Sequence, residues 1–78
     1  MMIRAYVLIQ TKVGQTARVA KEVAELDRVG SAVAVTGPYD VIAMVEAASI
    51  DGLGRVVVSR IQGVKGISRT LTCPVVHL

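Results

Sequence analysis

The sequence predicts an α+β fold with the element order βαββαβ, in which a four-stranded antiparallel sheet carries two helices on one face. Two stretches, 2–11 and 41–47, are apolar on both alternating faces, which is typical of strands at the centre of a sheet. Two weaker strand-like stretches, 29–36 and 67–77, suit its edges. A segment with apolar residues at helical spacing separates each central strand from the edge strand that follows it. The chain therefore repeats the order strand, helix, strand, with the turn 36–40 between the two halves.

The length of the chain limits its stability as a monomer. Its 78 residues form one domain, 1–78, and a chain this short buries only roughly 60% of the surface that its unfolded form exposes. The composition is 53% hydrophobic, dominated by Val, Ile, Ala and Leu, with two Tyr and no Phe or Trp. This composition favours strands with two buried faces, so we expect a partner subunit to add stability.

The first helix is predicted to follow Thr16, which we expect to be its N-cap. Its expected buried stripe consists of Ala17, Ala20, Val23 and Ala24. Charged residues occupy the opposite face, and the segment 26–28 ends the helix. The pattern indicates an amphipathic helix on the surface of the sheet.

The second helix is predicted to begin within Ser49-Ile50-Asp51-Gly52, which supplies capping side chains, and to end at Gly63. Its expected buried residues are Leu53, Val56, Val57 and Ile61. The run 56–58 is β-branched, but the i, i+3, i+4 spacing favours a helix. In the last strand Pro74 lacks an N–H group, which places that strand at an edge of the sheet.

The relative apolarity of the strands predicts the sheet order 4-1-3-2 of a ferredoxin-like fold. Two helices can cover only one face of a four-stranded sheet, whereas the central strands are apolar on both faces. We therefore expect a second subunit to bury the uncovered face, which gives a dimeric α+β barrel or sandwich.

The charge pattern argues against direct binding of nucleic acid. The net charge is +3, but the nine Lys and Arg residues are scattered singly from Arg4 to Arg69 with acids between them. Base stacking on the central strands would need exposed aromatic side chains, and only Tyr6 is available. No apolar run is long enough to cross a membrane and no signal-peptide pattern is visible, so the expected location is cytoplasmic.

Groups suited to catalysis or metal binding are sparse. Cys73 and the single His77 lie four residues apart, which is about 13 Å along a strand, so they cannot form a pair or share a metal. We expect Cys73 to be a buried structural thiol and His77 to be a surface residue. The sequence has neither a paired-carboxylate site nor a glycine-rich phosphate loop. We therefore expect no enzymatic activity, no metal and no cofactor.

The turn Thr36-Gly37-Pro38-Tyr39-Asp40 combines a glycine, a proline, an aromatic residue and a carboxylate. It can be a plain hairpin turn, because Gly37 tolerates a positive φ, Pro38 presets φ and Asp40 can accept backbone N–H bonds. It can also be a ligand site, because a free amino acid needs an acceptor for its ammonium group and donors for its carboxylate. The residues alone favour the plain turn and leave the ligand site open.

Three motifs span most of the chain: Thr36-Gly37-x-Tyr39-Asp40, then Ser49-Ile50-Asp51-x-Leu53, then Gly66-Ile67-x-x-Thr70-x-Thr72. Together they resemble the effector domain of the Lrp/AsnC, or feast/famine, family of transcription regulators. The resemblance implies a RAM domain (regulation of amino-acid metabolism) with the βαββαβ fold. It also implies homodimers formed through the sheets, rings of dimers that are commonly octameric, and amino-acid effectors bound between dimers.

Within this resemblance, the ligand-binding roles fall on Gly37, Tyr39 and Asp40 in the turn and on Thr70 and Thr72 in the last strand. Backbone N–H groups near Gly37 would hold the effector's carboxylate, and Asp40 or a threonine would hold its ammonium group. The family's DNA-reading helix-turn-helix has no counterpart before the first strand. The resemblance therefore implies a stand-alone RAM-domain protein that oligomerises and modulates transcription indirectly, through full-length Lrp/AsnC regulators.

Two other functions remain open. A small dimeric α+β barrel enzyme of the monooxygenase or isomerase type would share the fold, and a pocket lined by Arg4, Tyr6 and His77 would support it. A purely structural assembly partner would oligomerise without responding to a ligand. The variant Asp40→Ala separates this structural function from sensing, because only a sensor has a ligand response to lose.

Overall fold

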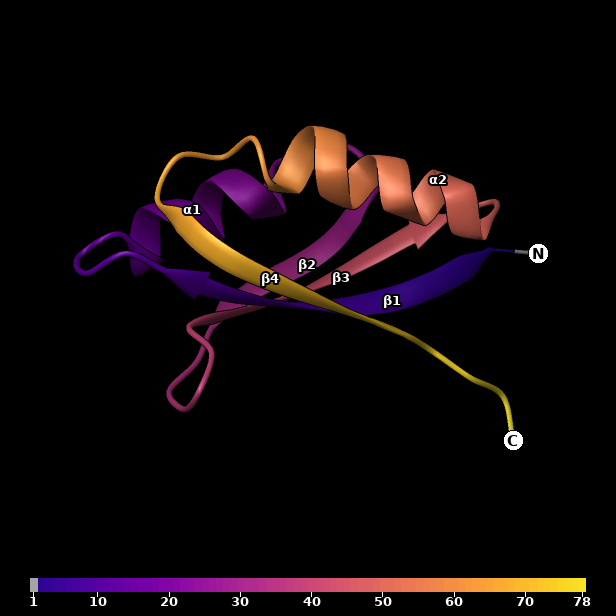
Figure 1. The fold of residues 1–78 in the computed structure, drawn as a ribbon, viewed down its shortest axis with the longest axis horizontal. Coiled ribbons are helices and arrows are strands. Elements are labelled where there is room, and N and C mark those ends of the chain that lie inside the picture. Colours follow the sequence, from indigo (N-terminus) through magenta and orange to yellow (C-terminus); the bar gives the residue numbers. More distant parts are fainter. Residues whose placement is uncertain (1) are drawn as a thin grey trace.

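The computed structural model describes residues 2–78 and contains one four-stranded antiparallel sheet with the helices on one face (Figure 1). The strands are β1 (Ile3–Thr11), β2 (Val29–Ala34), β3 (Val41–Ala47) and β4 (Ile67–Pro74). Their order across the sheet is β2-β3-β1-β4, which confirms the predicted fold and the predicted central and edge positions. Position 1 of the predicted domain 1–78 lies outside the described residues.

Both edge strands are shorter than predicted. β2 ends at Ala34, two residues before the predicted end, because the chain bends into the loop 36–40. β4 ends at Pro74, which has no N–H group to continue the pairing, although the Val75 N–H still donates to the Arg4 carbonyl at 2.9 Å. The central strands carry most of the pairing.

The second helical segment changes type along its length. It begins as α2 (Ile50–Arg55) and continues as the π-helix η1 (Val56–Ile61). The Gln62 N–H donates to the Val57 carbonyl at 2.9 Å, an i to i−5 bond that is typical of a π-helix. Ser49 is the N-cap and its hydroxyl accepts the Gly52 N–H at 3.0 Å, which confirms the predicted capping segment. The π-helix was not predicted.

The predicted N-cap of the first helix is wrong. In α1 (Thr16–Ala24) the N-cap position belongs to Gln15, whose side chain makes no capping bond. The Thr16 hydroxyl is instead hydrogen-bonded to the Thr11 hydroxyl at 2.8 Å, which joins the start of α1 to the end of β1. Across residues 2–78, no helix is both long and apolar enough to span a membrane.

The hydrophobic core lies between the helices and one face of the sheet. The predicted stripe of the second helix is confirmed, since Leu53, Val56, Val57 and Ile61 are all buried. The predicted stripe of α1 is partly wrong, because Val19 and Val23 are buried whereas Ala17 and Ala24 are exposed. Turning the two valines toward the sheet buries more apolar surface than turning the alanines would. The strand residues of this core are Ala5, Val7, Ile9, Val41, Ala43, Val45 and Ala47.

The other face of the sheet, called the open face below, has an apolar centre, and no helix of residues 2–78 covers it (Figure 1). Directly paired residues of antiparallel strands lie on the same face, and Leu8 is paired with Ile42 on one side and Leu71 on the other. Tyr6, Val33 and Leu71 are 49%, 54% and 47% exposed. Contiguous exposed apolar surface of this kind is common at sites of protein–protein interaction. The apolar side chains of the open face are Tyr6, Leu8, Val33, Ile42, Met44, Leu71 and Cys73, and the polar residues Arg4, Gln10, Ser31, Glu46 and Arg69 lie on the same face.

Candidate functional site

The loop 36–40 joins β2 to β3 and projects beyond the sheet on the side away from the helices (Figure 1). Gly37 has a φ of 143°, a conformation that side-chain-bearing residues rarely adopt. No atom lies within 4 Å of a Cβ built on Gly37, so the backbone conformation and not crowding requires glycine there. The Val35 N–H donates to the Asp40 carbonyl at 2.9 Å and closes the loop.

The end of β1 fixes this loop through three hydrogen bonds. The Asp40 N–H donates to the Ile9 carbonyl at 2.9 Å, and the Thr11 N–H donates to Asp40 Oδ2 at 2.8 Å. The Gln10 side-chain amide donates to the Pro38 carbonyl at 2.9 Å. Gln10 and Thr11 were not among the predicted site residues. The predicted sheet order could have identified them, because it places the end of β1 beside the start of β3.

The loop keeps groups of both polarities available to a ligand. A carboxylate has two oxygens and about four acceptor sites, so Asp40 can accept further hydrogen bonds beside the one from Thr11. Within residues 2–78, the N–H groups of Gly37 and Tyr39 donate to no other protein group. Pro38, which lies between Gly37 and Tyr39, has no N–H and adds no donor. An acceptor and free donors are therefore brought together within one short loop.

The two threonines lie apart from this loop. Thr70 is paired with Ile9 and Thr72 with Val7, so both threonines lie on the face that the helices cover. The Thr70 hydroxyl accepts a hydrogen bond from the Gln62 side-chain amide at 3.0 Å. Since β1 lies between β4 and β3, strands β4 and β3 are about 10 Å apart. One chain therefore brings Gly37, Tyr39 and Asp40 together, but not with Thr70 and Thr72.

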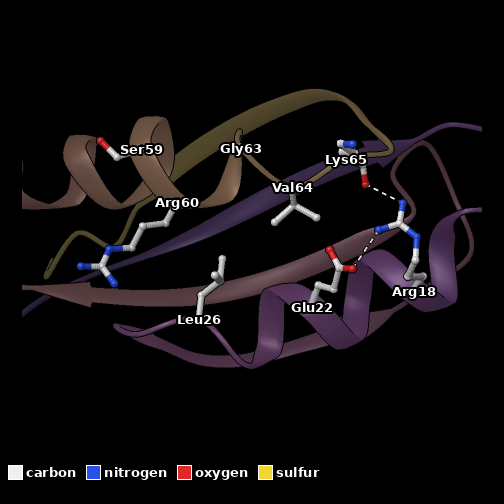
Figure 2. A pocket seen from close by; sticks show the side chains of 8 residues that line it. All are labelled: Arg18, Glu22, Leu26, Ser59, Arg60, Gly63, Val64 and Lys65. Atoms are coloured by element: carbon white, nitrogen blue, oxygen red, sulfur yellow. Dashed lines mark hydrogen bonds and ion pairs between the residues drawn. The ribbon is translucent and has the colours of Figure 1, made fainter.

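Several grooves flank the second helix. Thr70 lines one of about 320 Å³ with Gln62, Ser68 and Arg69. Another, of about 470 Å³, runs between α1 and η1 and is shown in Figure 2. At one end of it Arg18 forms an ion pair with Glu22 at 3.1 Å and donates to the Lys65 carbonyl at 2.6 Å. These contacts of Arg18 hold the loop before β4 against α1.

The prediction of a buried Cys73 is wrong, because this thiol is exposed. It is paired with Tyr6 on the open face, where no helix covers the edge strand β4. His77 is exposed beyond the end of β4, as predicted for a surface residue. Arg4 and Tyr6 are exposed on β1, and neither they nor His77 line the grooves described above.

Comparison with known proteins identifies the family. The family model described as the Lrp/AsnC ligand binding domain matches residues 4–77. TTHA0845 from Thermus thermophilus is 33% identical, with 97% of this chain and 95% of that chain covered and a TM-score of 0.90. The hypothetical protein PHS023 from Pyrococcus horikoshii is 26% identical, with 100% and 93% covered and a TM-score of 0.87. E. coli AsnC is 27% identical, with 97% of this chain but 52% of AsnC covered and a TM-score of 0.88.

No curated protein sequence gives a significant match. The family match nevertheless extends from the second residue of β1 to beyond the end of β4, and so reaches every element of the fold. This chain therefore belongs to the Lrp/AsnC ligand-binding domain family.

Proposed function

We propose that the protein is a non-enzymatic regulatory domain that binds a free amino acid at a site that includes the loop 36–40. The observation that carries this proposal is the match of residues 4–77 to a ligand-binding domain of transcription regulators. The similarity to E. coli AsnC, at 27% identity, supports a role in regulation. The sparse catalytic groups of the sequence are consistent with binding without turnover.

The chemistry of the loop suits both ends of an amino acid. The free acceptor sites of the Asp40 carboxylate can bind the ammonium group in a charge-assisted hydrogen bond. The N–H groups of Gly37 and Tyr39 can donate to the carboxylate. Asp40 is held by two hydrogen bonds to β1, so little conformational entropy would be lost when it binds a ligand.

Assembly is the second part of the proposal. Burying the open face against the same face of a second copy would remove its half-exposed apolar side chains from water. Thr70 and Thr72 would then contribute to a ligand site only from a different copy than the loop, since β1 separates them within one chain. A ligand held between copies would stabilise the assembly by mass action.

The proposed regulatory output is indirect. A ring of dimers, octameric or of another size, would respond to its effector and act on transcription through full-length Lrp/AsnC regulators, without contacting nucleic acid. We place this activity in the cytoplasm, where free amino acids and transcription regulators are both present.

The test is isothermal titration calorimetry of the protein with each of the twenty amino acids, with light scattering to follow particle size. We expect at least one amino acid to bind and to change the size, and Asp40→Asn to abolish that response. Asp51→Asn is the matched control, because it removes an exposed carboxylate from the first turn of α2. Assembly without binding of any amino acid would instead support a purely structural partner and would refute the sensor.

A further inference from the structure

We propose a second ligand site, for a small phosphorylated anion, in a hollow called the arginine pocket below. It has a volume of about 390 Å³ and lies where β3 ends and α2 begins. Three arginines and two serines line it together with the backbone at Gly52. They are Arg28, Arg55, Arg60, Ser49 and Ser59.

The arginines of this pocket have few partners in the protein. No carboxylate lines the pocket, and among residues 2–78 neither Arg28 nor Arg55 forms an ion pair. Arg60 has one acidic neighbour, Asp27, at 3.7 Å, and the two side chains are 47% and 72% exposed. An exposed pair of this length contributes little. Arg18 in the neighbouring groove differs from these arginines, because its guanidinium already binds the Glu22 carboxylate and the Lys65 carbonyl (Figure 2).

The rest of the pocket adds donors and space. The Ser49 hydroxyl accepts the Gly52 N–H at 3.0 Å, so its own O–H remains free to donate. A Cβ at Gly52 would lie 3.2 Å from Ala47 Cβ and 3.3 Å from Ser49 Oγ, so a side chain there would crowd these two lining residues. The lining of the pocket therefore combines three cationic side chains with small residues.

Two unusual backbone segments supply three of the pocket's side chains, those of Arg28, Ser59 and Arg60. Arg28 has a φ of 71° in a turn closed by a 3.3 Å bond from the Val29 N–H to the Leu26 carbonyl, where Gly or Asn is usual. Ser59 and Arg60 belong to η1. π-Helical turns are rare in proteins overall, but those that occur are often found at functional sites. The two segments are about 30 residues apart in the sequence and converge on this one hollow.

The chemistry favours phosphate over other anions. Each guanidinium presents a planar fork of donors that matches two oxygens of a phosphate, and three such groups suit a ligand with several charged oxygens. The volume of the pocket falls in the lower part of the range for small-molecule sites, which suits a small ligand. The arginines surround a hollow and do not form the long basic stripe that is typical of a nucleic-acid surface. The pocket and the loop 36–40 lie at opposite ends of β3, about 20 Å apart. The inference is therefore independent of the proposed amino-acid site.

Calorimetric titration of the full chain at low ionic strength with pyrophosphate, and separately with ATP, tests this site. We expect both to bind, and Arg55→Gln and Arg28→Gly each to weaken binding roughly tenfold, as the loss of a charge-assisted hydrogen bond would. Glycine suits the φ of Arg28, so Arg28→Gly removes the charge without straining the fold. The matched control is Lys21→Gln, which removes one positive charge from the exposed face of α1.

The outcomes separate the sources of the phosphate. Tighter binding of ATP than of pyrophosphate, with the same dependence on Arg55, assigns the pocket to a nucleotide, whereas equal binding assigns it to free phosphate groups. Absence of binding, or equal weakening by Lys21→Gln and Arg55→Gln, overturns the site. Tighter, Arg55-dependent binding of duplex DNA overturns a small-anion pocket in favour of a nucleic-acid surface. Asp40→Asn should leave pyrophosphate binding unchanged, which distinguishes this site from the proposed amino-acid site.

Discussion

The backbone N–H of Thr11 donates to the carboxylate of Asp40 at 2.8 Å, although the two residues are 29 positions apart. The hydroxyl of the same Thr11 is hydrogen-bonded to that of Thr16, the first residue of α1, at 2.8 Å. Thr11 thus joins the candidate ligand loop to the start of a helix on the other face of the sheet. Thr11 is therefore hydrogen-bonded both to Asp40 of the loop and to the first residue of α1.

Replacing Asp40 should separate its structural role from its binding role. Asp40→Ala leaves the Thr11 N–H without its acceptor and should lower the free energy of unfolding by about 1–2 kcal/mol. Asp40→Asn keeps an acceptor oxygen but loses the charge, so we expect a smaller loss of stability and the full loss of amino-acid binding. Urea unfolding at one fixed protein concentration measures the stability difference. Equal destabilisation by the two variants would contradict the role assigned to the carboxylate oxygen.

A charge on the open face should prevent assembly. Leu71 is paired with Leu8 and is half-exposed, so Leu71→Glu would place a carboxylate in the middle of the proposed interface. We expect the unchanged protein to sediment as a dimer or larger, and the variant to sediment as a folded monomer with an unchanged far-UV circular dichroism spectrum.

Val13→Glu is the control for this experiment, because Val13 is fully exposed in the turn between β1 and α1. It adds the same charge away from the open face, and we expect it to leave the assembly intact. A monomeric unchanged protein, or identical sedimentation of Leu71→Glu and the unchanged protein, would show that the open face is not the interface.

Glycine at position 66 should be far less replaceable than glycine at position 14. Both have positive φ, 97° and 79°, but a Cβ on Gly66 would lie 2.7 Å from an Arg18 nitrogen and 3.2 Å from Val19 Cγ2. No atom lies within 4 Å of a Cβ on Gly14. We expect Gly14→Ala to cost about 1 kcal/mol for the backbone alone and Gly66→Ala about 2–4 kcal/mol, since overpacking is added. Thermal unfolding of the two variants side by side measures the difference, and equal melting temperatures would refute it.

Arg28→Gly should make the protein more stable. An L-residue with left-handed backbone angles lowers the free energy of unfolding by about 1–2 kcal/mol, a cost that glycine avoids. Part of this gain is lost, because glycine has more conformational freedom in the unfolded chain. The expected net effect is a stabilisation of about 1 kcal/mol, measured by urea unfolding. Arg28→Ala is the control, because it removes the same side chain but keeps the unfavourable φ and so should not stabilise. A loss of stability in Arg28→Gly would mean that the guanidinium makes a compensating contact.

The sheet could be predicted almost completely, because β1 and β3 are apolar on both faces whereas β2 and β4 are not. The rotation of α1 could not be predicted as well, because alanines and valines both fall at helical spacing and only packing against the sheet selects Val19 and Val23. The π-helix could not be predicted either, since Val57 and Ile61 have a spacing that a regular helix also allows. Burial of Cys73 was predicted from residue type alone, which does not reveal that its strand face lacks a helix.

The candidate site was predicted only in part. Gly37, Tyr39 and Asp40 are neighbours in the sequence, so their proximity in the loop required no tertiary information. Thr70 and Thr72 were grouped with them through the family resemblance, and the sheet order places β1 between the two sets. The anchoring bonds from Gln10 and Thr11 depend on the β1–β3 register, which apolar patterning constrains only to within two residues.

The π-helical segment η1 contains one residue, Val58, that could be removed without loss of the helix's buried side chains. Val58 is 63% exposed in η1, and without it Leu53, Val56, Val57 and Ile61 would fall at i, i+3, i+4 and i+7 of an ordinary α-helix. A chain shorter by this one residue could therefore keep the same four side chains in the core. The deletion would shorten the helix surface between Arg55 and Ser59, while Ile61 and the sheet stayed in place. The fold thus has a position where an insertion or deletion can reshape a surface without disturbing its interior.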